Sequence, residues 1–246
     1  MSAVCRWDVL TREEISSLFP AALLVLPVGA TEQHGPHLAT GTDARLVQAV
    51  AERAAERAAR PDTILVAPTL PFGASDHHLP FGGTLSLGAT TFLAVLQDLL
   101  RSAARCGCRR AFVLNGHGGN AAACAVAVAE ASREHGLVAV TALFSQLLPE
   151  GSLDVPISGH AGVFETSLML ALHPEGVRPE RAAPSPGGAA RSRRRGLVVF
   201  EPGRWKELDG YTDSPDGATA ELGEAALELV VAAAAAAFEE VADLPI

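Results

Sequence analysis

The chain has 246 residues, of which 48% are hydrophobic and 19% are charged, a size and composition that suit one large globular domain. So apolar a composition excludes disorder over most of the length. The formal net charge of −9 argues against a general nucleic-acid-binding protein, because such a protein needs a basic face to neutralise phosphates.

Apolar runs alternate with helical patterns along the chain. In chain order the expected elements are a strand at 22–30, a helix at 43–60, a strand at 63–70, a helix at 90–105, a strand at 110–115, a helix at 121–134, a strand at 137–144 and helices at 163–172 and 218–240. The first run, ALLVLPVGA, is apolar throughout, as in a strand buried on both faces. The next helix begins at Asp43, where an N-cap is expected. The alternation predicts an α/β fold, a three-layer α/β/α sandwich with a mainly parallel sheet, formed by residues 1–246 as a single domain.

Several features bear on compartment and partners. The N-terminus has no pattern typical of a signal peptide, so we expect a cytoplasmic protein. The most apolar late segment, ALELVVAAAAAAFEEVADLPI, is short for a membrane span and is interrupted by Glu228, Glu239 and Glu240, which favours a buried or oligomer-facing helix. Cys5, Cys106, Cys108 and Cys124 form no metal-binding spacing and are expected to be free thiols, Cys124 in the core. The stretch 181–196 is expected to be an exposed loop.

Polar clusters follow the predicted strands at four strand-to-helix junctions. The first, TEQHGPHLATGTDARL, holds Glu32, His34 and Asp43, and the two-residue spacing of Glu32 and His34 places both on one side of an extended segment. Carboxylates and an imidazole suit Zn²⁺, Mn²⁺ or Fe²⁺. The other junctions supply Ser75, Asp76, His77 and His78, then His117, then His160 and Glu165.

Each cluster alone has a plainer explanation. Asp43 could be only an N-cap, and His117 only a loop histidine held by backbone groups. The run NGHGGN could be a phosphate-binding turn of a nucleotide-dependent oxidoreductase, but it lacks the P-loop lysine and the GxGxxG order. The joint pattern favours a metal site, because ligands bind parallel sheets at the carboxyl ends of the strands, where all four junctions fall.

Five motifs together resemble the creatininase (creatinine amidohydrolase) family. They are PVGATEQHGPHLATGTD, GASDHHLPFGGTLSL, NGHGGN, HAGVFETS and DGYTDSPDGATAELG, and they reach from about residue 25 to residue 223 in the family's order. The resemblance implies a creatininase-like α/β fold, a centre of two divalent metal ions (Zn, Mn or Fe), activity on C–N bonds of amides, and a homo-oligomer, commonly a hexamer.

The resemblance also implies roles for individual residues. Glu32 would bind one metal ion, His34 the other, and Asp43 would bridge them. His117 would join Glu32 on its ion, and His160 resembles the family's proton-shuttling histidine. The remaining assignments are Ser75 and His78 as substrate-binding residues that line the pocket. His37 matches no ligand position and is expected to brace the loop or the ligands.

The chain departs from creatininase itself at two points. Creatininase has a glutamate two residues after the histidine of the NGHGGN position, where this chain has Gly119, so we expect Glu165 to complete the second metal site. The creatinine-specific enzyme is thought to close tryptophans over its substrate, whereas Trp7 and Trp205 lie outside the segment 140–165 where such a lid is expected. Creatinine is therefore not the expected substrate.

The sequence thus predicts a metal-dependent amidohydrolase that cleaves an amide, cyclic amide or formamide C–N bond with a dimetal-activated water. Its partner would be a small-molecule amide substrate, with neither nucleic acid nor membrane involved. Two alternatives stay open: a peptidase of the same family, of the kind that trims the mycofactocin precursor, and a non-catalytic binding protein that retains the fold.

Overall fold

The computed structural model describes residues 5–19, 21–149, 151–157, 159–186, 199 and 201–246. Within them lies a five-stranded parallel sheet of order β1-β3-β2-β4-β5. Its strands are β1 (Cys5–Arg6), β2 (Leu23–Val28), β3 (Ile64–Val66), β4 (Arg110–Asn115) and β5 (Val138–Leu143). β2 is central, and its Leu23 pairs in register with Ile64 of β3 and with Arg110 of β4.

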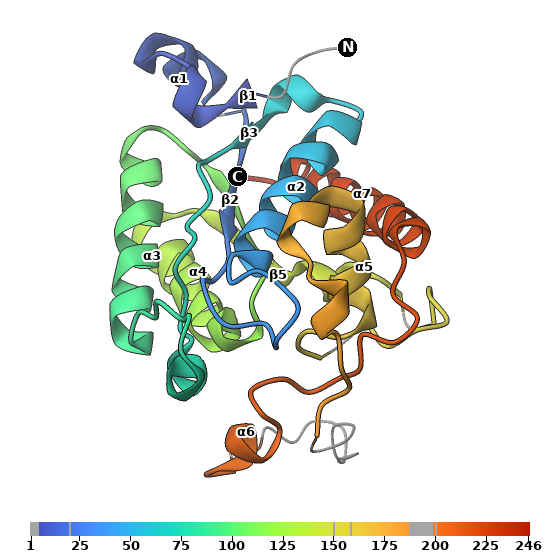
Figure 1. The fold of residues 1–246 in the computed structure, drawn as a ribbon. Coiled ribbons are helices and arrows are strands. Elements are labelled where there is room, and N and C mark those ends of the chain that lie inside the picture. The colour runs from blue at the N-terminus through green and yellow to red at the C-terminus, as the bar shows by residue number, and fades with distance from the viewer. Residues whose placement is uncertain (1–4, 20, 150, 158, 187–198, 200) are drawn as a thin grey trace.

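Helices cover both faces of this sheet. The helices are α1 (Arg12–Leu18), α2 (Thr42–Arg57), α3 (Ala89–Arg105), α4 (Ala121–His135), α5 (Val163–Leu172), α6 (Arg204–Glu207) and α7 (Ala220–Ala242). Figure 1 shows α3 and α4 on one face and α2, α5 and α7 on the other, with α6 apart from both layers beyond one end of the sheet. The predicted three-layer α/β/α fold with a parallel sheet is confirmed.

The side chains of β2 explain why its sequence is apolar throughout. Leu23 and Val25 pack into the core shared with α2 and α7, whereas Leu24 and Leu26 pack into the core shared with α3 and α4. Successive side chains of a strand point to opposite faces, so a strand between two helical layers needs apolar residues at every position. Each fully buried leucine contributes roughly 1.5–3 kcal/mol to folding.

Some predicted boundaries differ from the observed ones. The helix predicted from Asp43 begins at Thr42, its N-cap is Gly41, and Asp43 lies in its first turn, so the N-cap prediction was wrong. The strand predicted over 63–70 is reduced to Ile64–Val66, because the chain beyond Ala67 contains prolines that cannot donate to a ladder.

The expectations about loops, cysteines and membranes have mixed outcomes. Residues 187–196 of the predicted exposed loop lie outside the described residues, and Ser185 just before them is buried. All four cysteines are free, and burial raises the pKa of the Cys124 thiol to about 12, as expected of a core residue. In the described part of the chain, no helix combines the length and apolarity needed to cross a bilayer.

Candidate metal centre

The carboxyl ends of the strands bring together segments that are distant in sequence. Glu32 and His34 follow β2, Asp43 opens α2, and His117 follows β4. All four side chains are buried, and Glu32 and His34 have no exposed surface. Ionisable groups this deep require charged partners or a bound ion.

These side chains form two groups that share Asp43. In the first, His117 Nδ1 lies 3.2 Å from Glu32 Oε1 and 3.2 Å from Asp43 Oδ2. In the second, His34 Nε2 lies 3.1 Å from Asp43 Oδ1, and Glu165 completes the group. One ligand atom from each member of a group lies within 4.8 Å of the others, the spacing of residues that could hold a metal ion. Asp43 therefore presents one carboxylate oxygen to each group.

Backbone carbonyls fix the orientation of both imidazoles. His34 Nδ1 lies 3.1 Å from the carbonyl oxygen of Glu32, and His117 Nε2 lies 3.2 Å from that of Ala74. A carbonyl only accepts, so these nitrogens donate, and the opposite nitrogen of each ring faces carboxylates. Metal-binding histidines are commonly held in this way by their second nitrogen.

Without an ion, protons must occupy the space between these acceptors. Burial disfavours protonation of His34 and His117, but the carboxylates of Asp43 and Glu32 outweigh it and raise the pKa of both to about 10. The same contacts hold the Asp43 pKa well below its ordinary value, in spite of burial. Both oxygens of Glu32 and Oδ2 of Asp43 are buried without a hydrogen-bond partner. Such orphaned oxygens beside imidazole nitrogens fit divalent cations that accept N and O ligands.

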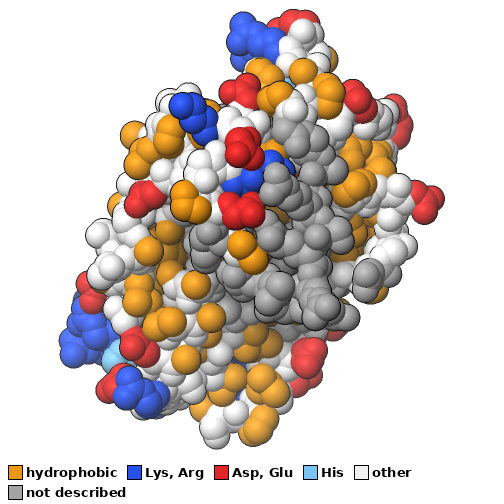
Figure 2. All heavy atoms as spheres, turned by 90° about the horizontal axis from the view of Figure 1, so that it is seen from below, with side chains coloured by type: hydrophobic (Ala, Val, Ile, Leu, Met, Phe, Trp, Pro, Cys, Tyr) orange, Lys and Arg blue, Asp and Glu red, His pale blue; other side chains and the backbone are white. Residues whose placement is uncertain are grey.

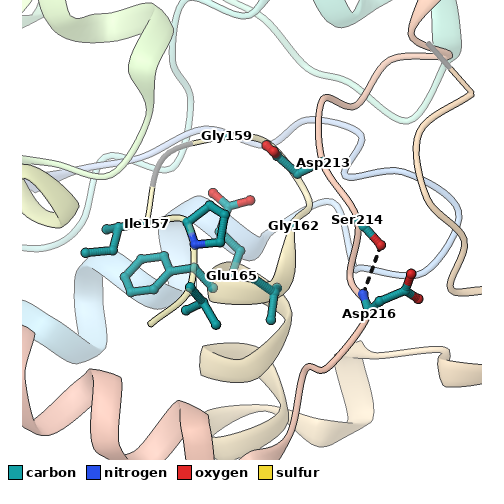
Figure 3. A pocket seen from close by; sticks show the side chains of 11 residues that line it. Ile157, Gly159, Gly162, Glu165, Asp213, Ser214 and Asp216 are labelled. Carbon is teal, nitrogen blue, oxygen red and sulfur yellow. Dashed lines mark hydrogen bonds between the residues drawn. The ribbon is translucent and has the colours of Figure 1, made fainter. Parts of the chain in front are cut away.

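Gly119 explains why the second group draws its carboxylate from α5. A Cβ at Gly119 would lie 2.4 Å from the carbonyl oxygen of Ala74 and 2.4 Å from His117 Nε2, so the backbone leaves no room for a side chain. Glu165 is instead supplied by the first turn of α5, where its Oε2 accepts a hydrogen bond of 2.6 Å from the backbone N–H of Ala161. Burial raises the Glu165 pKa to about 7. Glu165 lines a cavity of about 310 Å³. Figure 3 shows it there, with Asp213 on the segment alongside α5.

His160 and His78 face Glu32 from two other segments. His160 Nε2 donates to the Gln33 carbonyl oxygen at 2.8 Å, which leaves Nδ1 3.6 Å from Glu32 Oε1. Burial and the nearby His34 charge lower the His160 pKa well below its ordinary value. His160 also forms a third possible ligand group with Glu32 and His34, so the geometry permits a ligand role besides proton transfer.

His78 is positioned by Gln33. The Gln33 side-chain amide donates to His78 Nδ1 at 2.6 Å, so Nε2 carries the hydrogen and faces Glu32 Oε1 at 3.3 Å. Burial and the neighbouring His77 lower the His78 pKa to about 2, which keeps the ring neutral.

Ser75 and His37 lie behind the cluster. The Ser75 side chain has no exposed surface, and its hydroxyl is 3.3 Å from His117 Nε2. This contact orients His117, whereas His78 lines a large cavity beside the cluster. His37 Nε2 is hydrogen-bonded to Thr166 Oγ1 at 3.0 Å, beside Glu165 on α5, as expected of a residue that braces the site.

Sequence reasoning missed Gln33 and Trp205, and it named His77 without assigning it a role. Gln33 orients both His78 and His160, and its position between two proposed ligands was the available signal. Trp205 and His77 line the cavity of about 750 Å³ that also touches His78 and His160. No local pattern around Trp205 indicates that it reaches the site.

Comparison with known proteins identifies the family of the chain. The family described as creatinine amidohydrolase (creatininase) matches residues 8–238. The chain belongs to the creatininase family. It is 35% identical over 241 residues to a creatinine amidohydrolase of Pseudomonas putida, which covers 89% of each chain. It is also 37% identical over 203 residues to a mycofactocin precursor peptide peptidase of Mycobacterium tuberculosis, covering 77% of this chain and 75% of that one.

Solved structures of this family share the fold. A crystal structure of creatinine amidohydrolase superposes with a TM-score of 0.83 at 30% identity, covering 99% of this chain and 100% of that one. A creatininase described as a Mn form matches at a TM-score of 0.81, 30% identity and 96% and 98% coverage. A mutant creatininase described as Zn-Zn type matches at 0.79, 33% identity and 97% and 98% coverage.

Proposed function

We propose that this creatininase-family protein is a metal-dependent amidohydrolase that hydrolyses a C–N bond other than that of creatinine. The observation that carries the proposal is Asp43, whose two carboxylate oxygens face two different groups of N and O ligands. Glu32 and His117 would hold one divalent ion with Asp43, and His34 and Glu165 would hold the other. Bound there, two such ions would lower the pKa of a water molecule and polarise an amide carbonyl.

The protein's own residues would bind and move protons around that centre. His160 Nδ1 is the ring nitrogen that faces the cluster, because Nε2 is committed to the Gln33 carbonyl. The neutral ring can accept a proton at Nδ1 and deliver it to the departing nitrogen of the amide. His78, held by Gln33, lines the adjoining cavity, where it would contact substrate.

Two cavities favour an extended substrate, which makes a peptide the second candidate. The cavity of about 750 Å³ touches His78 and His160, and another of about 660 Å³ touches Glu165. Gly118 and Gly159 line both cavities, so the two cavities adjoin beside the cluster. An amide bond held there has room on both sides, as a short peptide requires. The similarity to the mycofactocin precursor peptide peptidase supports the same candidate.

Metal content combined with a substrate screen tests the proposal. Protein prepared with Zn²⁺, Mn²⁺ or Fe²⁺ is expected to retain about two ions per chain after dialysis. The Asp43→Asn variant should lose both, whereas the matched Asp62→Asn variant, altered at an exposed residue, should retain them. Circular dichroism of each variant checks folding.

The loaded protein is then assayed on cyclic amides, formamides and short peptides. Failure of the wild-type chain to retain any of the three metals would rule out the proposed hydrolase and favour a metal-free binding protein. If the protein hydrolyses the peptides but none of the cyclic amides or formamides, the peptidase is the better supported of the two candidates.

We also propose that the chain acts in the cytoplasm as a homo-oligomer, a hexamer, as its family resemblance implies. Light scattering coupled to size-exclusion chromatography measures the assembly directly, and a monomer at micromolar concentration would contradict it.

A further inference from the structure

Trp205 lies against His78 and His160 beside the candidate metal centre, although it is distant in sequence from every proposed ligand. Its indole centroid is 4.6 Å from the His78 ring and 4.9 Å from the His77 ring. The His160 ring is 5.9 Å away and meets the indole edge to face. The residue belongs to α6, which packs against the short helix at Asp76–Phe81 and lies at the lower end of Figure 1.

α6 carries both charged and aromatic side chains. Figure 2 views the molecule from that end and shows, among the coloured side chains, hydrophobic ones together with both acidic and basic ones. Arg204, beside the tryptophan, is paired with Glu207 at 3.0 Å. Lys206 is exposed and does not line the cavity beside α6, so Trp205 and the Glu207-paired Arg204 are what α6 presents to a ligand there.

The indole forms one wall of the cavity of about 750 Å³. His78 and His160 form the side of this cavity next to the metal ligands, and Leu208 extends the apolar wall beside Trp205. Gly118 also lines it, and a Cβ there would meet nothing within 4 Å, so the backbone at this point is open. The cavity therefore has an aromatic wall on one side and the candidate metal centre on the other, with open space between them.

We propose that Trp205 determines substrate specificity by packing its indole against a planar, unsaturated group adjacent to the amide bond that is cleaved. Indole faces bind flat π systems in offset or edge-to-face contact, with a preference beyond simple burial of area. His77 and His78 flank the indole and hold it in place. The inference rests on the proposed function, because it requires a metal ion at the neighbouring ligands.

A pair of chelators that differ by one ring tests the proposal. Acetohydroxamic acid and benzohydroxamic acid bind a metal ion through the same atoms, but only the second carries a phenyl group. Titration calorimetry on the Zn²⁺-loaded protein should show benzohydroxamic acid binding about tenfold more tightly, from the usual energy of an aromatic pair. The ratio of the two dissociation constants should fall towards one in Trp205→Ala and should be retained in Trp205→Phe.

Fluorescence gives a second readout that does not depend on catalysis. The sequence contains two tryptophans, and Trp7 packs on Phe19 near the N-terminus. In a Trp7→Phe background Trp205 is the single indole, so benzohydroxamic acid should change its emission while acetohydroxamic acid changes it less. Equal responses to both chelators would contradict contact with the ring.

The outcomes separate this inference from the proposed function. If the wild-type protein retains no zinc, the proposed function fails and the inference fails with it. If zinc is retained but neither chelator binds, or both bind equally, only the inference is overturned. If Trp205→Ala weakens both chelators by the same factor, Trp205 merely supports His77 and His78, which also overturns it.

Discussion

Replacing Gly119 with alanine should damage both folding and metal binding, although it adds a single methyl group. The added Cβ would lie 2.4 Å from the Ala74 carbonyl oxygen and 2.4 Å from His117 Nε2. Ordinary contacts are about 1 Å longer, and the obstacles are a backbone carbonyl and a buried imidazole that already contact each other. The chain must therefore shift, and overpacking of this kind costs about 1–3 kcal/mol.

The expected losses follow from the position of His117. For a chain of this size, 1–3 kcal/mol corresponds to a Tm lowered by about 2–12 °C. Displacing His117 from the Ala74 carbonyl removes the contact that fixes its orientation, a loss that typically weakens metal affinity 10–100-fold. Thermal unfolding of the metal-free protein and zinc competition titrations measure the two effects separately.

Gly118→Ala is the matched control. A Cβ at Gly118 meets no heavy atom within 4 Å, so the same substitution one residue away should leave zinc affinity unchanged. Restricting the unfolded chain should even stabilise this variant by about 0.4–1 kcal/mol. If Gly119→Ala and Gly118→Ala have the same Tm and zinc affinity, the steric explanation for the absent side chain at Gly119 is wrong.

Two further predictions concern Glu165 and His37. Glu165→Gln keeps the hydrogen bond from Ala161 but removes a charge from the group that contains His34. Zinc bound to this variant, measured by mass spectrometry, should therefore fall from about two ions per chain to about one. Retention of both ions would contradict the ligand role of Glu165. Burial, aided by the charge of His34, lowers the His37 pKa from 6.5 to about 4. Between pH 6.5 and pH 4 the unfolded chain is therefore protonated at His37 while the folded chain is not, so the free energy of unfolding falls as the pH falls. The loss of stability approaches about 3 kcal/mol near pH 4. Denaturant titrations should show that the stability of His37→Gln falls less steeply with decreasing pH than that of the wild type. Equal pH dependence in the two proteins would refute this role of His37.

The sheet could be predicted because burial on both faces leaves a strong pattern. β2 is apolar at every position, and α5 (Val163–Leu172) coincides with its predicted bounds. β1 has two residues, too few to show any periodicity. α1 was missed although Thr11 and Glu14 form a capping box, a signal that the sequence did contain.

Position after a strand predicts part of the candidate site. Glu32, His34 and His117 come directly after β2 and β4, so the parallel sheet alone brings them together. Trp205 comes from α6, whose position depends on packing against Asp76–Phe81 far away in sequence. No rule of spacing or periodicity connects these segments, so an aromatic wall at the site was not foreseeable.

Asp43 shows how the site overrides local preference. Its residue type favours capping, yet the N-terminus of α2 has no side-chain cap, and the Asp43 carboxylate turns to His34 and His117 instead. Its place in the first turn still suits an ionised carboxylate, because the helix dipole is positive there. Even so, Asp43 Oδ2 and both Glu32 oxygens stay buried without hydrogen bonds, and each such group costs about 1–3 kcal/mol. A binding protein that needed no ion would be more stable with apolar residues at these positions, so the unpaired oxygens favour a cation-dependent function over a metal-free scaffold.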